Sequence, residues 1–216
     1  MFGIVLKDMY ETFCIKKNTL AFIASFLLMF VMTITNKSAY FYFLMVGILI
    51  PFLSSAPLQY SMEQDEISQF NQILLTYPLT KREIITMKYL SCILFTLGSW
   101  VISFILFCIY TFIYHSMSLQ HSLYIYFFGC ILSIALLAIF NTGFYILGTK
   151  KGNIMYGVGV VIFVIFHLFG WILASDITYL VSIDINILLI IGLIISLILL
   201  LISYLLSIKI YAKRYS

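Results

Sequence analysis

Charged side chains are scarce in this chain: Asp, Glu, Lys and Arg together make up 9% of its 216 residues, whereas hydrophobic residues make up 63%. Soluble domains carry about 25% charged residues, so an ordinary soluble fold is excluded. A transmembrane helix needs about 20 predominantly apolar residues, which leaves room for some six spans with short loops and for no separate soluble domain. The sequence therefore predicts one all-α integral membrane domain over residues 1–216.

Motifs that carry chemistry are lacking too. Neither HExxH nor GxSxG, the patterns of zinc proteases and serine hydrolases, occurs in the chain. Residues 143–150 read GFYILGTK, which ends in Gly-Thr-Lys instead of the Gly-Lys-Thr of a phosphate-binding loop and lies in an apolar run. The four cysteines have no disulfide or metal-ligand spacing. We therefore expect a chain without a catalytic site, a metal site or a cofactor of its own.

Apolar runs fill most of the chain instead. We expect membrane spans over residues 19–35, 39–59, 84–114, 122–147, 154–174 and 185–208. Pro51 and Pro57 should kink the second span, because each removes a backbone donor and clashes with the preceding turn.

The first 17 residues are amphipathic. One helical face carries the apolar residues Phe2, Val5, Leu6, Met9, Tyr10 and Phe13. The other face carries Lys7, Asp8, Glu11 and Thr12. This pattern predicts an interfacial helix that lies along the lipid headgroups before the first span.

Loop charges indicate the orientation, because loops rich in Lys and Arg stay in the cytoplasm. With the N-terminus inside, eleven of the twelve basic residues fall in inner segments and only Lys37 falls outside. Six spans then place both termini and residues 61–83 in the cytoplasm. The net charge of +4 follows from this arrangement, so it indicates contact with anionic lipid and needs no nucleic acid as its explanation.

The loop between the second and third spans is unusually polar for this chain. Seven of the twenty charged residues lie between Ser61 and Leu90. Apolar residues at three- and four-residue spacing predict a short amphipathic helix over residues 65–77. Pro78 should end that helix, and Thr80 with Glu83 has the capping-box order that begins a new helix near residue 81.

Few polar residues lie within the apolar runs. His167 and Asn141 are candidates for a substrate path, although hydrogen bonding between helices explains His167 at least as well and explains Asn141 better. A face of small residues, which would let another helix approach closely, is predicted in the last span. It consists of Gly192, Ser196, Ser203 and Ser207.

The interfacial helix, the six spans and the polar loop together resemble the ABC-2 family of transporter permeases, in its small six-span branch. The loops of that branch read roughly as an acidic pair, an aromatic residue, Leu-Leu, Pro-Leu, a hydroxyl and a basic residue, then Ile and Lys-Tyr. The matching positions here are Asp65, Glu66, Phe70, Leu74, Leu75, Pro78, Leu79, Thr80, Lys81, Ile84, Lys88 and Tyr89. This motif covers about a seventh of the chain, whereas the topology covers all of it.

In that family the loop is a coupling helix seated in a cleft of a separate ATPase subunit. The resemblance implies an ATPase-coupling interface made by Glu63, Asp65, Glu66, Phe70, Leu74, Pro78, Lys81, Arg82 and Glu83. The last three of these would begin the helix that carries the motion of the ATPase into the membrane.

The resemblance also implies the partners and the setting. These are a bacterial plasma membrane, a dimer of ATPase subunits that binds ATP and Mg²⁺, and a second permease subunit, alike or different. Within the branch, the chain is most similar to permease subunits that export phenol-soluble modulins, which are amphipathic peptides, and more distantly to peptide-antibiotic immunity exporters. A pathway rich in Phe, Tyr and Ile also suits an amphipathic substrate. A membrane scaffold or sensor with the same spans is the alternative from another class.

Overall fold

The computed structural model describes residues 2–74, 76–177 and 184–214, without the side chains of residues 163, 164 and 166–177. Every regular element within these ranges is a helix. In chain order they are α1 (Phe2–Phe13), α2 (Lys16–Thr35), α3 (Ala39–Tyr42), η1 (Phe43–Leu49), α4 (Ile50–Ser54), α5 (Ala56–Ile67), α6 (Phe70–Leu74), α7 (Lys81–Cys108), η2 (Ile109–Ile113), α8 (Leu119–Ile177) and α9 (Ile185–Arg214).

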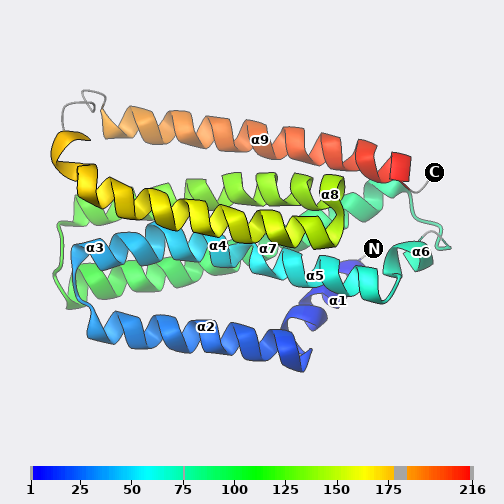
Figure 1. Ribbon diagram of the computed structural model, residues 1–216, viewed down its shortest axis with the longest axis horizontal. Coiled ribbons are helices and arrows are strands. Elements are labelled where there is room, and N and C mark those ends of the chain that lie inside the picture. The colour runs from blue at the N-terminus through cyan, green and yellow to red at the C-terminus, as the bar shows by residue number, and fades with distance from the viewer. Residues whose placement is uncertain (1, 75, 178–183, 215–216) are drawn as a thin grey trace.

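Five helical segments of the described residues are long and apolar enough to cross a bilayer. They are Lys16–Thr35, Ala39–Ile67, Lys81–Ile113, Leu119–Ile162 and Ile185–Arg214. The expectation of an all-helical membrane protein is therefore confirmed. Figure 1 shows these segments side by side along one direction, with both termini at the same end of the bundle as α6.

The fourth of these segments contains a sharp turn. Gly148 has φ 77° and ψ 176°, which is not helical. Figure 1 shows α8 turning back on itself there, so the spans predicted over residues 122–147 and 154–174 occupy the two arms of one hairpin. A glycine suits this position because a positive φ costs it little.

The second segment is interrupted at Ser55, between its two prolines. Pro57 stands in the first turn of α5, where a missing backbone donor costs least, whereas Pro51 follows η1 with no break in the helical conformation. Ser55 separates the two helices, and its amide bonds the Phe52 carbonyl at 3.1 Å. The helical segment also continues to Ile67, eight residues beyond the predicted end at residue 59. The extension stays ordered because its charges find partners, as described below.

The interior consists of two groups of buried side chains. One lies around Ile85 and Phe140, where α5, α7, α8 and α9 meet. The other lies around Tyr42 and Tyr110, where η1 meets α7 and η2. Between them α8 approaches η1 so closely that a Cβ atom on Gly129 would lie 2.3 Å from the Val46 carbonyl oxygen. The apolar residues of α2 and α9 are instead largely exposed, as expected of surfaces that lipid or another subunit covers.

Candidate functional site

Residues 65–77 form two helical pieces, the end of α5 and the short helix α6, instead of the single helix predicted there. Helix α5 ends at Ile67, Gln69 adopts a left-handed conformation with φ 51°, and α6 follows. The reason is that Asp65 and Leu74 are both buried. Nine residues of an unbroken helix would place these two side chains on opposite faces, because each residue turns the helix by about 100°.

The predicted start of α7 is confirmed. The Thr80 side-chain oxygen accepts a hydrogen bond from the Glu83 amide at 3.3 Å, and the Glu83 carboxylate accepts one from the Thr80 amide at 2.8 Å. These reciprocal bonds satisfy two free amides of the helix start. The Lys81 ammonium then donates to the Ala212 carbonyl at 3.3 Å, which ties this end of α7 to the end of α9.

A buried group of charges joins α1, α5 and α7, and we call it the charge cluster. Its members are Lys7, Asp8, Glu11, Ser61, Asp65 and Lys88. The Asp65 carboxylate pairs with both ammonium groups of the cluster, those of Lys7 and Lys88. The Lys88 ammonium also lies 3.4 Å from Asp8 and 3.2 Å from the Ser61 hydroxyl, and Lys7 lies 2.9 Å from Glu11. Helix α1 is thus attached by ion pairs to the base of the polar loop.

The charge cluster explains how α1 is oriented. Both predicted faces exist, but the polar one is covered by protein, since Asp8 is 2% exposed and Thr12 is fully buried. The predicted apolar face is divided: Phe2, Leu6 and Tyr10 are each more than 60% exposed, whereas Val5 is buried. This orientation suits a helix whose outer side meets lipid and whose inner side is paired within the bundle.

Three carboxylates face two ammonium groups in the cluster, so one negative charge is in excess. The carboxylate oxygens of Asp8, Glu11 and Asp65 lie within 4.8 Å of one another, close enough to share a cation. Two lysine ammonium groups already lie among them, which favours ion pairing over metal binding. Burial raises the pKa of Glu11, an effect that its bond to Lys7 partly offsets. A proton on Glu11 would remove the excess charge.

The outer surface of the loop carries exposed apolar and charged side chains next to the buried cluster. Glu66 is exposed, and the large apolar residues Ile67, Ile73 and Tyr77 are 69%, 47% and 57% exposed. We call these four residues the loop tip. The tip combines apolar area with negative charge, as a partner-binding surface does.

The predicted coupling residues separate into two groups. Asp65 and Leu74 are buried, so neither side chain faces outward in this conformation. The others are partly or fully exposed: Glu63, Glu66, Phe70, Pro78, Lys81, Arg82 and Glu83. Two of these make contacts toward the N-terminus, since Glu63 pairs with Lys17 at 3.1 Å and the Lys7 ammonium lies 4.2 Å above the Phe70 ring.

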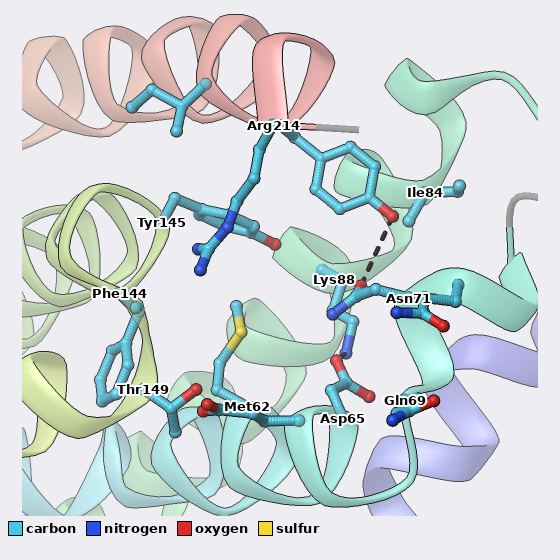
Figure 2. A pocket seen from close by; sticks show the side chains of 15 residues that line it. Met62, Asp65, Gln69, Asn71, Ile84, Lys88, Phe144, Tyr145, Thr149 and Arg214 are labelled. Atoms are coloured by element: carbon cyan, nitrogen blue, oxygen red, sulfur yellow. Dashed lines mark hydrogen bonds and ion pairs between the residues drawn. The ribbon is translucent and has the colours of Figure 1, made fainter. Parts of the chain in front are cut away.

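A cavity of about 180 Å³ lies beside the charge cluster. Figure 2 shows Asp65 and Lys88 on one side, Phe144, Tyr145 and Thr149 of α8 near its turn, and Arg214 of α9. The Tyr211 hydroxyl donates to the Asn71 side-chain oxygen at 3.4 Å across the cavity. The loop, the α8 turn and the end of α9 therefore meet around one polar space.

Of the two polar residues predicted within the membrane, the structure describes the side chain of Asn141. Asn141 is fully buried, donates to the Leu137 carbonyl at 3.1 Å and accepts a weak bond from the Cys92 thiol at 3.9 Å. His167 belongs to α8, but its side chain lies outside the described residues.

The small-residue face of α9 packs within this chain. Ser196, Ser203 and Ser207 are buried. The Tyr89 hydroxyl of α7 shares hydrogen bonds with Ser203 and Ser207, at 2.6 and 2.9 Å. A Cβ atom on Gly192 would lie 3.5 Å from Ile131 of α8.

Sequence reasoning missed the charge cluster, although one signal for it was present. Lys88 stands among apolar residues, and an ionisable group in such a run requires a partner of opposite charge. The acidic face of residues 1–17 offered that partner, but no spacing rule joins α1 to α7 across eighty residues of sequence.

Comparison with known proteins identifies the family of the chain. Residues 3–212 match the family model described as ABC-2 family transporter protein. No curated protein and no solved structure shows significant similarity to the chain.

Proposed function

Since the chain belongs to the ABC-2 family of transporter proteins and is therefore the membrane permease component of an ABC transporter, we propose that it is an exporter permease driven through its α5–α7 loop. The observation that carries this proposal is the juxtaposition of the loop tip with the charge cluster. An ATPase that moved the tip would move Asp65, and the ion pairs of Asp65 would pass that motion to α1 and α7.

The geometry of the loop supports transmission of force. Helix α7 begins at the capping box of Thr80 and Glu83. It continues directly into the π-helix η2, so the helical segment runs unbroken from Lys81 to Ile113. A helix with a fixed start is a stiff lever, and rigid elements of this kind transmit domain motions. In this proposal Glu66 and the neighbouring residues Glu63, Phe70, Pro78, Arg82 and Glu83 contact a dimer of ATPase subunits, which binds ATP and Mg²⁺.

The proposed topology has six crossings with both termini in the cytoplasm. The two arms of α8 would cross separately, because the turn at Gly148 reverses the chain. In this proposal the loop tip, the α8 turn and both termini lie on the cytoplasmic side of a bacterial plasma membrane, an orientation that the positions of Lys and Arg support. The location of both termini at one end of the bundle supports an even number of crossings.

We propose an amphipathic peptide of the phenol-soluble modulin type as the substrate, moved between this chain and a second permease subunit. The support is the scarcity of charge and the abundance of aromatic residues, which make up 18% of the chain. Export of an antimicrobial peptide for resistance is the closest alternative, and a scaffold or sensor role is the alternative without transport.

An ATPase assay on the complex isolated in mild detergent tests this function. The expected result is an ATPase that co-purifies with the chain and whose turnover rises when an amphipathic helical peptide is added. Replacement of Glu66 by Lys together with Ile73 by Ser should abolish this stimulation while the chain stays folded, because both side chains are exposed. If peptide left the ATPase turnover unchanged with both the unmodified chain and the double variant, the peptide-export proposal would be contradicted. A chain that is isolated without any ATPase would favour the scaffold or sensor role.

A further inference from the structure

A long apolar groove of about 820 Å³ lies between α2 and the rest of the bundle. Its α2 wall includes Phe22, Phe26 and Phe30, and its α7 wall includes Leu94 and Phe95. Figure 1 shows α2 standing at the edge of the bundle, attached through α1 at one end and α3 at the other. Many apolar side chains of α2 are exposed, so this edge of the bundle would face the surrounding bilayer.

Aromatic contacts close one end of the groove. The Phe13 ring of α1 lies 5.6 Å from the Phe22 ring and 5.8 Å from the Phe95 ring, so it joins three helices. Below it, Lys17 pairs with Glu63 at 3.1 Å and ties α2 to α5. The groove thus has a floor at the end that the proposed topology places in the cytoplasm.

The groove offers hydrocarbon surface and no free hydrogen-bonding group among its serines. The Ser25 hydroxyl donates to the Ala21 carbonyl at 2.8 Å, Ser54 to Pro51 at 2.6 Å and Ser99 to Thr96 at 2.7 Å. Each hydroxyl is therefore satisfied inside its own helix. An occupant with polar groups would gain nothing from these walls, whereas a saturated chain loses nothing.

The length of the groove matches one leaflet. Its α2 wall runs from Thr19 to Phe30. Eleven residues of helix rise by about 16 Å, close to half of the roughly 30 Å hydrocarbon core of a bilayer. A chain lying in this groove would reach from the headgroup region to the middle of the membrane.

Positive charge stands at the closed end. Lys16 is exposed in the first turn of α2, three residues before Thr19, and it makes no hydrogen bond or ion pair among the described residues. Its neighbour Lys17 is also exposed, but the Lys17 ammonium already forms an ion pair with Glu63. A phosphate at headgroup depth would complete the pairing of Lys16.

We propose that this groove binds an anionic phospholipid of the cytoplasmic leaflet, with an acyl chain along α2 and the phosphate against Lys16. Hydrocarbon walls, one-leaflet length and a cation at the headgroup end together specify this ligand, whereas an amphipathic peptide would leave its polar face without partners in the groove. The bound lipid fills the space between α2 and α7 and holds α2 at its distance from the bundle.

Native mass spectrometry of the intact complex tests this proposal. The complex is exchanged into micelles with equal amounts of phosphatidylglycerol and phosphatidylethanolamine, and retained lipids are counted. The expected result is retention of phosphatidylglycerol with about a fivefold preference, the effect of one lysine at an anionic headgroup. Lys16→Gln should remove the preference while some lipid of either kind is kept.

Filling the groove gives the second arm. Gly98 lines the groove, and a Cβ atom there would meet nothing within 4 Å, so Gly98→Leu adds volume without a clash to its immediate surroundings. It should lower the count of retained lipid at least threefold. Gly157→Leu is the matched control, because a Cβ atom at Gly157 also meets nothing within 4 Å and α8 places it outside the groove.

A photoreactive acyl chain on phosphatidylglycerol provides a readout on the unmodified protein. Its cross-links should fall on residues 19–30 and 94–102. Equal retention of the two lipids by the unmodified chain, undiminished retention by Gly98→Leu, or cross-links spread evenly over α9 would each overturn the proposal. So would a loss of the two-permease complex in Gly98→Leu with lipid retention unchanged, since the groove would then be a subunit contact.

Discussion

At the scale of single residues, Lys88 is the centre of the account. It lies 2% exposed between Asp8 of α1 and Asp65 of α5. Removing one partner of a buried ion pair leaves an uncompensated charge, which costs about 3 to 5 kcal/mol. We expect Lys88→Met to lower the unfolding free energy in detergent by that amount. Changing Asp65 to Asn in the same chain should restore part of the loss, and a Lys88→Met chain as stable as the parent would contradict the pairing.

Glu11 makes the attachment of α1 depend on pH. Burial raises the pKa of Glu11 in the docked state above its ordinary value of 4.5. The docked state therefore binds the proton on Glu11 more tightly than the released state does, so the contribution of Glu11 to docking is fully present below pH 4.5 and is lost as the pH rises through the raised pKa. Hydrogen exchange of residues 2–13, corrected for intrinsic rates, should show this loss of protection. Glu11→Gln should remove the pH dependence, and protection in the parent that grew with pH would contradict it.

At the scale of elements, the turn of α8 depends on Gly148. Its φ of 77° lies in the left-handed region, and a Cβ atom there would lie 3.4 Å from the Arg214 guanidinium. With ψ at 176°, this conformation is one that essentially only glycine adopts, and a side chain there costs about 1 to 3 kcal/mol. We therefore expect Gly148→Ala to destabilise the chain by about that amount in a thermal unfolding series.

The control for this prediction lies in the same helix. Gly157 is helical and has open space around it, so Gly157→Ala should be neutral or stabilising by up to about 1 kcal/mol. If the two alanine variants unfolded alike, the left-handed turn would not be a determinant of the hairpin.

The elements also show what could be predicted from the sequence. The capping box at Thr80 and Glu83 depends on residues three apart, and its prediction was correct. The break at Gln69 was missed, because apolar spacing continues through it and only the burial of Asp65 against α1 and α7 requires it. Local patterns thus predict helix starts, whereas a break that tertiary ion pairs impose has no local signal.

At the scale of the whole molecule, hydrophobicity predicted the class and most of the long helices, but it did not predict how they divide between core and periphery. The apolar residues of α2 are as hydrophobic as those of η1, yet Ile23 is 54% exposed and Val46 is fully buried. In a bilayer both surroundings are apolar, so hydropathy cannot distinguish lipid from protein neighbours.

The central claim is that the loop tip is where the ATPase acts on this chain, and photo-cross-linking from single positions tests it most directly. A photoreactive amino acid is placed at Ile73, which is exposed on α6, and in a second chain at Lys37, which is exposed between α2 and α3 at the opposite end of the bundle. We expect a cross-link to the ATPase subunit from position 73 and none from position 37. Cross-linking to the ATPase from position 37, with none from position 73, would contradict both the proposed coupling loop and the orientation of the chain in the membrane.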